Sequence, residues 1–308
     1  KNEITVQAIT HMKIRKLSLF LSLATFFFAS PLLATSEQDE LWFFVLVKSN
    51  NHSQSMDGEL KLLNYHFFSE LFGKEKDKIK SASLTRLGKD EAIFEYEDRG
   101  EAFYYEGGHF NTLEAVDSAH PNTDYRFQIQ LSSGETMDAT LALRGPDGKT
   151  DIPAPIHIYF YQQGKKIRQE QVNPELPLLV KWSPYSNGRS DVNGIVDDMI
   201  FLVFQNCHGE RVFHTGLPFK EANYTKYSVT EMEVPAGRFK AGQTYALFVE
   251  FPHVVDSAIA QGIPGFSSYA TATYTDIRTS GELNDSECPD KTPPLDTGQT
   301  DRMEVEIK

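Results

Sequence analysis

The chain has 308 residues, of which 40% are hydrophobic and 24% are charged, the composition of a globular protein with enough apolar material for cores. Aromatic residues make up 12%, which favours β-structure because flat side chains cover pleated sheet faces. The formal net charge is −13 and the sequence has no basic stripe, so nucleic-acid binding is excluded as an expected function.

The segment 12–34, MKIRKLSLFLSLATFFFASPLLA, has the pattern of a secretory signal peptide. Basic residues precede a short apolar core, and Pro31 breaks the helix before Ala34, a small residue suited to cleavage. A membrane anchor is the alternative, but the apolar run is short for a hydrocarbon layer of about 30 Å. Cleavage after Ala34 removes four basic residues and one acidic residue, which changes the charge from −13 to −16. We therefore expect residues 1–34 to be leader and signal peptide, and the mature chain to be secreted or periplasmic without a transmembrane span.

The first half of the mature chain predicts short strands. The segment 41–48 is apolar and rich in aromatic and β-branched residues, as a buried strand is. The segment 61–73 has apolar residues at mixed spacing, which fits a helix and fits a bent strand nearly as well. Turn residues bound further expected strands at 82–86, 92–97, 101–105, 124–131 and 140–143. Gly148, Pro153 and Pro155 then indicate a domain boundary near residue 150.

The second half repeats this pattern. Strands are expected at 156–160, 178–182, 199–205, 211–214, 229–234, 244–251 and 269–277. Short strands with turn residues between them, and no convincing long amphipathic helix, indicate β-sandwiches. The prediction is an all-β chain of two consecutive sandwich domains, a divergent one at 40–150 and a second at 153–280, followed by a polar, disordered tail at 281–308.

Three aromatic residues are expected to hold facing sheets together. In LPLLVKWSP (176–184) apolar residues alternate, so Trp182 should be a buried plug between two sheets. Tyr245 begins a strand, where a tyrosine corner would direct its hydroxyl to nearby backbone. The segment PNTDYRFQIQ weakly repeats AGQTYALFVE, and gives Tyr125 the corresponding place. A chance similarity between strand entries is the alternative explanation of this repeat.

The second half resembles a fibronectin type III or immunoglobulin-like domain. The residues that carry the resemblance are LPLLVKWSP, MIFLVFQNCHGERVFHTG and VTEMEVPAGRFKAGQTYALFVEF. Over about residues 41–280 the arrangement is also similar to a group of uncharacterised secreted bacterial proteins, in which a divergent β-domain precedes such a sandwich. The long segment 252–268 departs from that pattern. The resemblance implies binding, spacing or adhesion, although this fold hosts many functions.

Two features are candidate structural sites. Cys207 and Cys288 are the only cysteines, and after export they form either one disulfide or two free thiols. The loop SNGRSDVNGIVDD offers oxygen ligands of the kind that Ca²⁺ prefers, although an exposed loop uses the same residues and the spacing misses the EF-hand order. The four candidate calcium ligands are Asp191, Asn193, Asp197 and Asp198.

The sequence has no catalytic signature: GxSxG, HExxH, the P-loop and GxGxxG are all absent. The nine histidines are scattered, and GGH at 107–109 lacks the context that a nucleophile needs. The leading hypothesis is an exported, non-catalytic interaction or adhesion protein without a cofactor, whose partner is an extracellular or periplasmic protein or glycan. The alternatives are a cryptic secreted hydrolase and a carbohydrate-binding accessory module. The aromatic residues considered for sugar stacking are Tyr104, Tyr105, Tyr159 and Tyr161.

Overall fold

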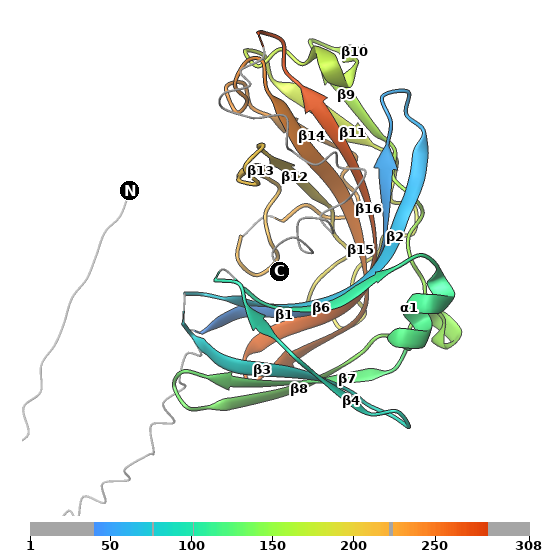
Figure 1. The fold of residues 1–308 in the computed structure, drawn as a ribbon, viewed down its shortest axis with the longest axis vertical. Coiled ribbons are helices and arrows are strands. Elements are labelled where there is room, and N and C mark those ends of the chain that lie inside the picture. The colour runs from blue at the N-terminus through green and yellow to red at the C-terminus, as the bar shows by residue number, and fades with distance from the viewer. Residues whose placement is uncertain (1–39, 76, 101, 222–223, 283–308) are drawn as a thin grey trace, which may run out of the picture. The chain divides into compact units, whose positions relative to one another are not determined.

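A curved sheet of eight strands runs through the described part of the protein (Figure 1). The structure is a computed structural model that describes residues 40–75, 77–100, 102–221 and 224–282, and over these the chain is all-β. The strand order in this central sheet is β13 (Arg211–His214), β12 (Phe201–Gln205), β15 (Thr244–Ala260), β16 (Ile263–Arg278), β1 (Leu41–Gln54), β2 (Leu60–Gly73), β6 (Ala102–Phe110) and β5 (Glu97–Asp98). Strands β1, β2, β15 and β16 have 14 to 17 residues, far more than the usual length of about 5–6.

Two smaller sheets pack against this central sheet. The first has the order β4 (Ala92–Glu95), β3 (Ile79–Arg86), β7 (Asp124–Leu131) and β8 (Thr136–Ala142). The second has the order β10 (Lys165–Ile167), β9 (Ile158–Gln162), β11 (Leu178–Trp182) and β14 (Glu231–Val234). Helix α1 (Leu113–Ala119) and two 3₁₀ turns, Pro146–Gly148 and Gln169–Gln171, lie in the connections.

Both smaller sheets cover the same face of the central sheet. Along β16, Ile263 and Tyr269 belong to the core beneath the first small sheet, and Ile277 belongs to the core beneath the second. These three positions differ by even numbers, so they point to one face of the strand. Phe266 and Tyr274, at the alternating positions, point to the other face. The result is two sandwiches that share the central sheet. Neither small sheet covers the opposite face of the central sheet, to which Phe266 and Tyr274 point.

The sequence of β2 shows why local periodicity left that segment ambiguous. Phe67 and Leu71 lie in the core beneath the first small sheet, whereas Phe68 and Phe72 pack on the opposite face of the central sheet. A strand that is buried on both faces loses the apolar–polar alternation that identifies half-buried strands. The bent-strand interpretation of 61–73 is therefore the right one. By contrast, β7 is buried on one side only and alternates without a break.

The expectation of two consecutive domains at 40–150 and 153–280 is not confirmed, because strands from both halves share the central sheet. Strand β1, from the first half, pairs in parallel with β16, from the second half, in a register that runs from Phe44 opposite Gly265 to Ser53 opposite Tyr274. The described residues group as one compact unit. The boundary near residue 150 separates the two small sheets along the chain, but the core of the first sandwich also contains Ile263 and Tyr269 from the second half.

The segment 252–268 is also different from the expectation. Strand β15 does not stop at Pro252 but continues to Ala260, and a tight hairpin leads directly into β16. Pro252 is tolerated because pairing between β12 and β15 ends at Phe201 and Glu250, so beyond that point β15 lies at a sheet edge. The expected leader at 1–34 and most of the expected tail lie outside the described residues. Among the residues that are described, no helix is both long and apolar enough to cross a membrane.

Candidate functional site

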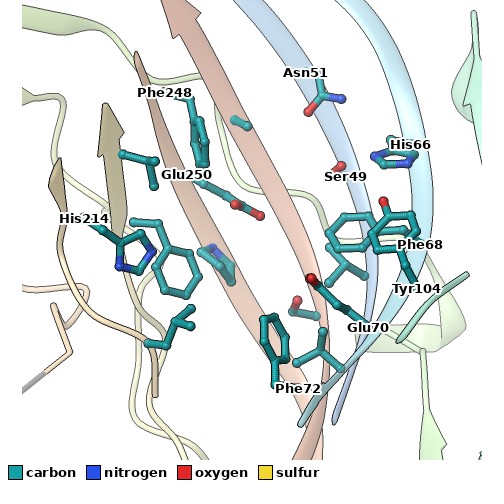
Figure 2. A pocket seen from close by; sticks show the side chains of 18 of the residues that line it. Ser49, Asn51, His66, Phe68, Glu70, Phe72, Tyr104, His214, Phe248 and Glu250 are labelled. Atoms are coloured by element: carbon teal, nitrogen blue, oxygen red, sulfur yellow. The ribbon is translucent and has the colours of Figure 1, made fainter. Parts of the chain in front are cut away.

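The face of the central sheet that the small sheets leave uncovered holds a cavity of about 310 Å³. Its walls come from β1, β2, β6, β12, β13, β15 and β16, so nearly every strand of the central sheet contributes to it. Figure 2 shows side chains from β15 and β13 facing side chains from β1 and β2 across this space. A volume of this size is at the lower end of the range for small-molecule sites.

Strand alternation places the aromatic residues in the cavity. Phe43 lies on β1 opposite Phe72 of β2, and their rings stack with centroids 4.2 Å apart. Phe248 of β15 packs on Tyr274 of β16, with centroids 5.4 Å apart. Because these rings stand on strands whose other face is packed in a core, the framework of the cavity is preorganised.

Charged groups interrupt this aromatic lining. Burial, with a smaller contribution from the negative charge of Glu70, raises the pKa of Glu250 from 4.5 to about 7. Figure 2 shows both carboxyl groups directed into the space between β15 and β2. Arg99 lies with its guanidinium carbon 4.1 Å from the ring centroid of Tyr104. Burial lowers the pKa of His214, on the far wall, to about 4.

A second group of polar side chains lies at the β2–β6 edge of the cavity. His66 Nε2 is 2.8 Å from Glu106 Oε1, and His109 Nδ1 is 3.8 Å from the same oxygen. The two imidazole rings stack with centroids 4.0 Å apart. Burial and the neighbouring charge of His66 lower the pKa of His109 to about 4. Burial alone would raise the pKa of Glu106, but the hydrogen bond and charge of His66 hold it below its usual value.

Sequence reasoning missed both groups of residues. Glu250 is a single acidic residue in the apolar segment 244–251, and it belongs to no recognisable motif. His66 is separated from His109 along the chain, and they meet only because β2 pairs with β6. The available signal was the tetrapeptide Glu106–His109, in which two glycines separate a carboxylate from an imidazole.

The aromatic residues expected to hold the sheets together are buried. Trp182 is 3% exposed in the core beneath the second small sheet, and its indole Nε1 donates to Val229 O at 3.0 Å. The Tyr245 hydroxyl accepts a hydrogen bond from Lys240 N at 2.7 Å. The Tyr125 hydroxyl donates to Pro121 O at 2.8 Å. Both tyrosines therefore bond to backbone four or five residues upstream, which fixes the entry of β7 and of β15.

The acidic loop between β11 and β12 satisfies its carboxylates with protein donors. Asp198 is fully buried, accepts hydrogen bonds from the backbone N–H groups of Arg189 and Val254, and lies 2.8 Å from His253 Nδ1. Asp191 accepts from three backbone N–H groups of its own loop and from the Ser257 hydroxyl.

The remaining two loop residues are also engaged. Asp197 pairs with Lys226 at 2.7 Å, and the Asn193 side chain donates to Ser257 O. Within the described ranges, the three aspartates do not converge as one set of ligand atoms. The calcium site therefore stays a prediction, and the structure supplies a structural role for each carboxylate.

The remaining sequence-predicted residues are the two cysteines and four tyrosines. Cys207 lies in the turn between β12 and β13, whereas Cys288 is outside the described residues, so their pairing stays a prediction. Tyr104 is a buried wall of the cavity and Tyr105 packs on the opposite side of β6, in the core beneath the first small sheet. Tyr159 and Tyr161 lie on β9 beneath the ammonium groups of two lysines. These four tyrosines thus form no common platform.

No protein-family model matches this chain, and no curated protein matches its sequence. Solved structures similar to it include the FN1–FN3 domains of chicken CNTN1, at 9% identity and a TM-score of 0.22 over 76% of this chain and 63% of that one. Others are a 1.5-MDa bacterial ice-binding adhesin, at 11% identity and 0.23 over 79% and 66%, and the Yersinia pseudotuberculosis adhesin InvE, at 12% and 0.16 over 80% and 65%. The chain thus spans less than two thirds of the length of each of these three structures. At such identities and TM-scores these matches add no argument, and the all-β sandwich fold rests on the sheets of this chain itself.

Proposed function

We propose that this chain is an exported, non-catalytic interaction module, and that its ligand binds in the cavity on the uncovered face of the central sheet. The observation that supports the proposal is the cavity of about 310 Å³, whose aromatic walls stand on strands already fixed by two cores. A preformed concave site with a few convergent polar groups is the usual form of a small-ligand site.

The chemistry of the walls favours an amphipathic cation, with an apolar or aromatic body and one ammonium or guanidinium group. Phe248 and Tyr274 offer ring faces beside the Glu250 carboxyl, and aromatic faces attract cations through their quadrupole. The raised pKa of Glu250 shows that the cavity disfavours an isolated negative charge at that position. A bound cation compensates that charge, so binding and ionisation of Glu250 reinforce each other.

The proposal is tested by calorimetric titration of the full chain with 2-phenylethylamine as the cationic probe. The matched neutral probe is 2-phenylethanol and the matched anion is 3-phenylpropionate. We expect the amine alone to bind measurably, with an affinity that increases from pH 6 to pH 8 as Glu250 ionises. Glu250→Gln should lower this affinity by about tenfold or more, a loss of roughly 1.4 kcal/mol.

The control variant is Glu91→Gln, which removes the same charge from an exposed position outside the cavity lining. It should leave the affinity within about twofold of the parent, because the long-range field of one exposed charge is screened by salt. Equal binding of amine and alcohol, or equal losses in the two variants, would show that Glu250 does not recognise a cation. Absence of binding by all three probes at millimolar concentration would remove this ligand class.

Export is a separate part of the proposal and rests on the segment 12–34. Expression of the full chain in a secreting host, followed by intact-mass measurement of the exported protein, should show loss of residues 1–34. A product that stays in the cytoplasm at full mass would contradict export without affecting the ligand proposal. The same mass, compared before and after reduction and alkylation, reports whether Cys207 and Cys288 are paired.

A further inference from the structure

We propose that His66, Glu106 and His109 form a binding site for one divalent transition-metal ion, with Zn²⁺ as the ion that the donor set fits best. His66 lies on β2, and the other two residues lie on the neighbouring strand β6. One possible ligand atom from each residue lies within 4.8 Å of the other two. His66 also lines the cavity on the uncovered face, so this site lies at the cavity's edge (Figure 2).

A β-bulge in β6 brings the two ligands of that strand to one side. On a regular strand, residues three positions apart point to opposite faces. Here Phe68 pairs with Glu106 and His66 pairs with His109, so two steps on β2 match three steps on β6. The extra residue turns the carboxylate and the imidazole toward His66, and bulges of this kind are frequent beside functional sites.

The bulge requires its two glycines. Gly108 has a φ of +101°, a backbone conformation that L side chains rarely adopt. A Cβ on Gly107 would lie 2.5 Å from Phe67 Cδ1 and 2.8 Å from Phe67 O, and Phe67 is fully buried. Any side chain at Gly107 would therefore have to displace both backbone and core. The sequence Glu-Gly-Gly-His thus fixes the relative position of a carboxylate and an imidazole.

The distances fit a small tetrahedral ion. Bonds of about 2.0–2.1 Å to Zn²⁺ separate tetrahedral ligand atoms by roughly 3.3 Å. The Glu106 Oε1 contacts, 2.8 Å to His66 Nε2 and 3.8 Å to His109 Nδ1, lie on either side of that value. Two imidazoles and one carboxylate suit Zn²⁺, Cu²⁺ or Ni²⁺ better than Ca²⁺ or Mg²⁺, which prefer oxygen alone.

A second observation points to a ligand at the same place. Glu106 Oε2 is buried, and among the described residues it has no hydrogen-bond partner. A buried carboxylate oxygen without a partner is unfavourable, because its desolvation is not repaid. A simple ion pair between Glu106 and His66 leaves this oxygen unsatisfied, whereas a metal ion can take up both carboxylate oxygens. Together with the two imidazole nitrogens, the two carboxylate oxygens supply four donor atoms, a complete tetrahedral set for Zn²⁺.

The test is calorimetric titration of the full chain, without a histidine tag and after treatment with a chelator, with zinc chloride. We expect one ion per chain. His109→Ala and Glu106→Gln should each lower the zinc affinity at least tenfold, whereas His157→Ala should not change it, since His157 lies beside β9 and next to Tyr159. Zinc should raise the melting temperature of the parent and of His157→Ala, but not that of the two site variants.

A measurement on the unmodified chain keeps the test independent of variant folding. Diethyl pyrocarbonate labels accessible imidazoles, and peptide mass spectrometry locates the label. We expect zinc to protect His109, which is 20% exposed, and to leave His157 unprotected. No stoichiometric binding by the parent, undiminished binding by both site variants, or equal labelling of His109 with and without zinc would each overturn the proposal. None of these outcomes depends on binding of the amine probe in the cavity.

Discussion

The shared central sheet predicts that a lesion in one sandwich lowers the stability of the other. The perturbation is Phe127→Ala in β7, where the fully buried ring packs 4.8 Å from the ring of Phe44 in β1. Truncation of a buried phenylalanine costs about 3–5 kcal/mol. For a unit of this size each kcal/mol lowers the melting temperature by about 2–4 °C, so we expect a decrease on the order of 10 °C.

The assay uses tryptophan fluorescence to follow the sandwich that was not altered. The chain has two tryptophans, and Trp42→Phe leaves only Trp182, buried beneath the second small sheet. Because that sheet and the sheet of β7 both pack on the central sheet, the Trp182 signal should melt at the lowered temperature together with far-ultraviolet circular dichroism. The control is Ile93→Ala in β4, 61% exposed, which should change the free energy of unfolding by no more than about 0.5 kcal/mol.

Two separate transitions would refute this reasoning. If Trp182 in the Phe127→Ala variant melts at the parent temperature while circular dichroism records an earlier step, the sandwiches unfold independently. The pairing of β1 with β16 would then not couple them, and two consecutive domains would describe the chain better.

Three further predictions follow from individual contacts. Asp117→Ala should lower the free energy of unfolding by about 3 kcal/mol in urea titration, because the fully buried Lys48 ammonium loses its carboxylate partner. The remaining hydrogen bond from Lys48 to Asn122 limits the loss. Tyr245→Phe should cost about 1–2 kcal/mol in the same assay, since it removes the acceptor of a backbone N–H, and an unchanged midpoint would contradict a structural role for the hydroxyl. Glu250 binds its proton more tightly in the folded chain, with a pKa of about 7 against 4.5, so the stability it contributes is present below pH 4.5 and is lost as the pH increases to 7. Glu250→Gln should therefore gain melting temperature relative to the parent between pH 5 and pH 8, and a constant difference would contradict the raised pKa.

The sequence predicts those elements whose two faces have different surroundings. Strand β7 alternates because one face is in a core and the other is not, and β11 with Trp182 is recognisable for the same reason. Strand β2 is buried on both faces, so its pattern fits two structures equally. The turn residues near 150 mark a change from one small sheet to the other. The pairing of β1 with β16, which joins the two halves in one sheet, leaves no signal in local sequence patterns.

The candidate sites were less predictable than the fold because they consist of contacts between strands. The pKa of Glu250 is raised by burial in a cavity that side chains of several strands line. No spacing along β15 reveals this burial. His66 and His109 become neighbours through a register that includes a bulge, and only its glycines are visible in the sequence. In the acidic loop the composition predicts a calcium site. In the structure, Asp191 and Asp198 accept hydrogen bonds from backbone N–H groups of the loop.

Strand β1, the first strand along the chain, pairs in parallel with β16, the last one, and this pairing affects how the protein folds. The hydroxyl of Thr275 donates to Gln54 O across 221 positions of sequence, so this part of the sheet cannot assemble before the end of β16 has been synthesised. Contacts between such distant residues make folding slow. During that delay the backbone groups of β1 that pair with β16 have no partner, so a chaperone that holds newly made chain extended would protect this edge from aggregation. The same delay would keep the polypeptide unfolded during the export that we propose.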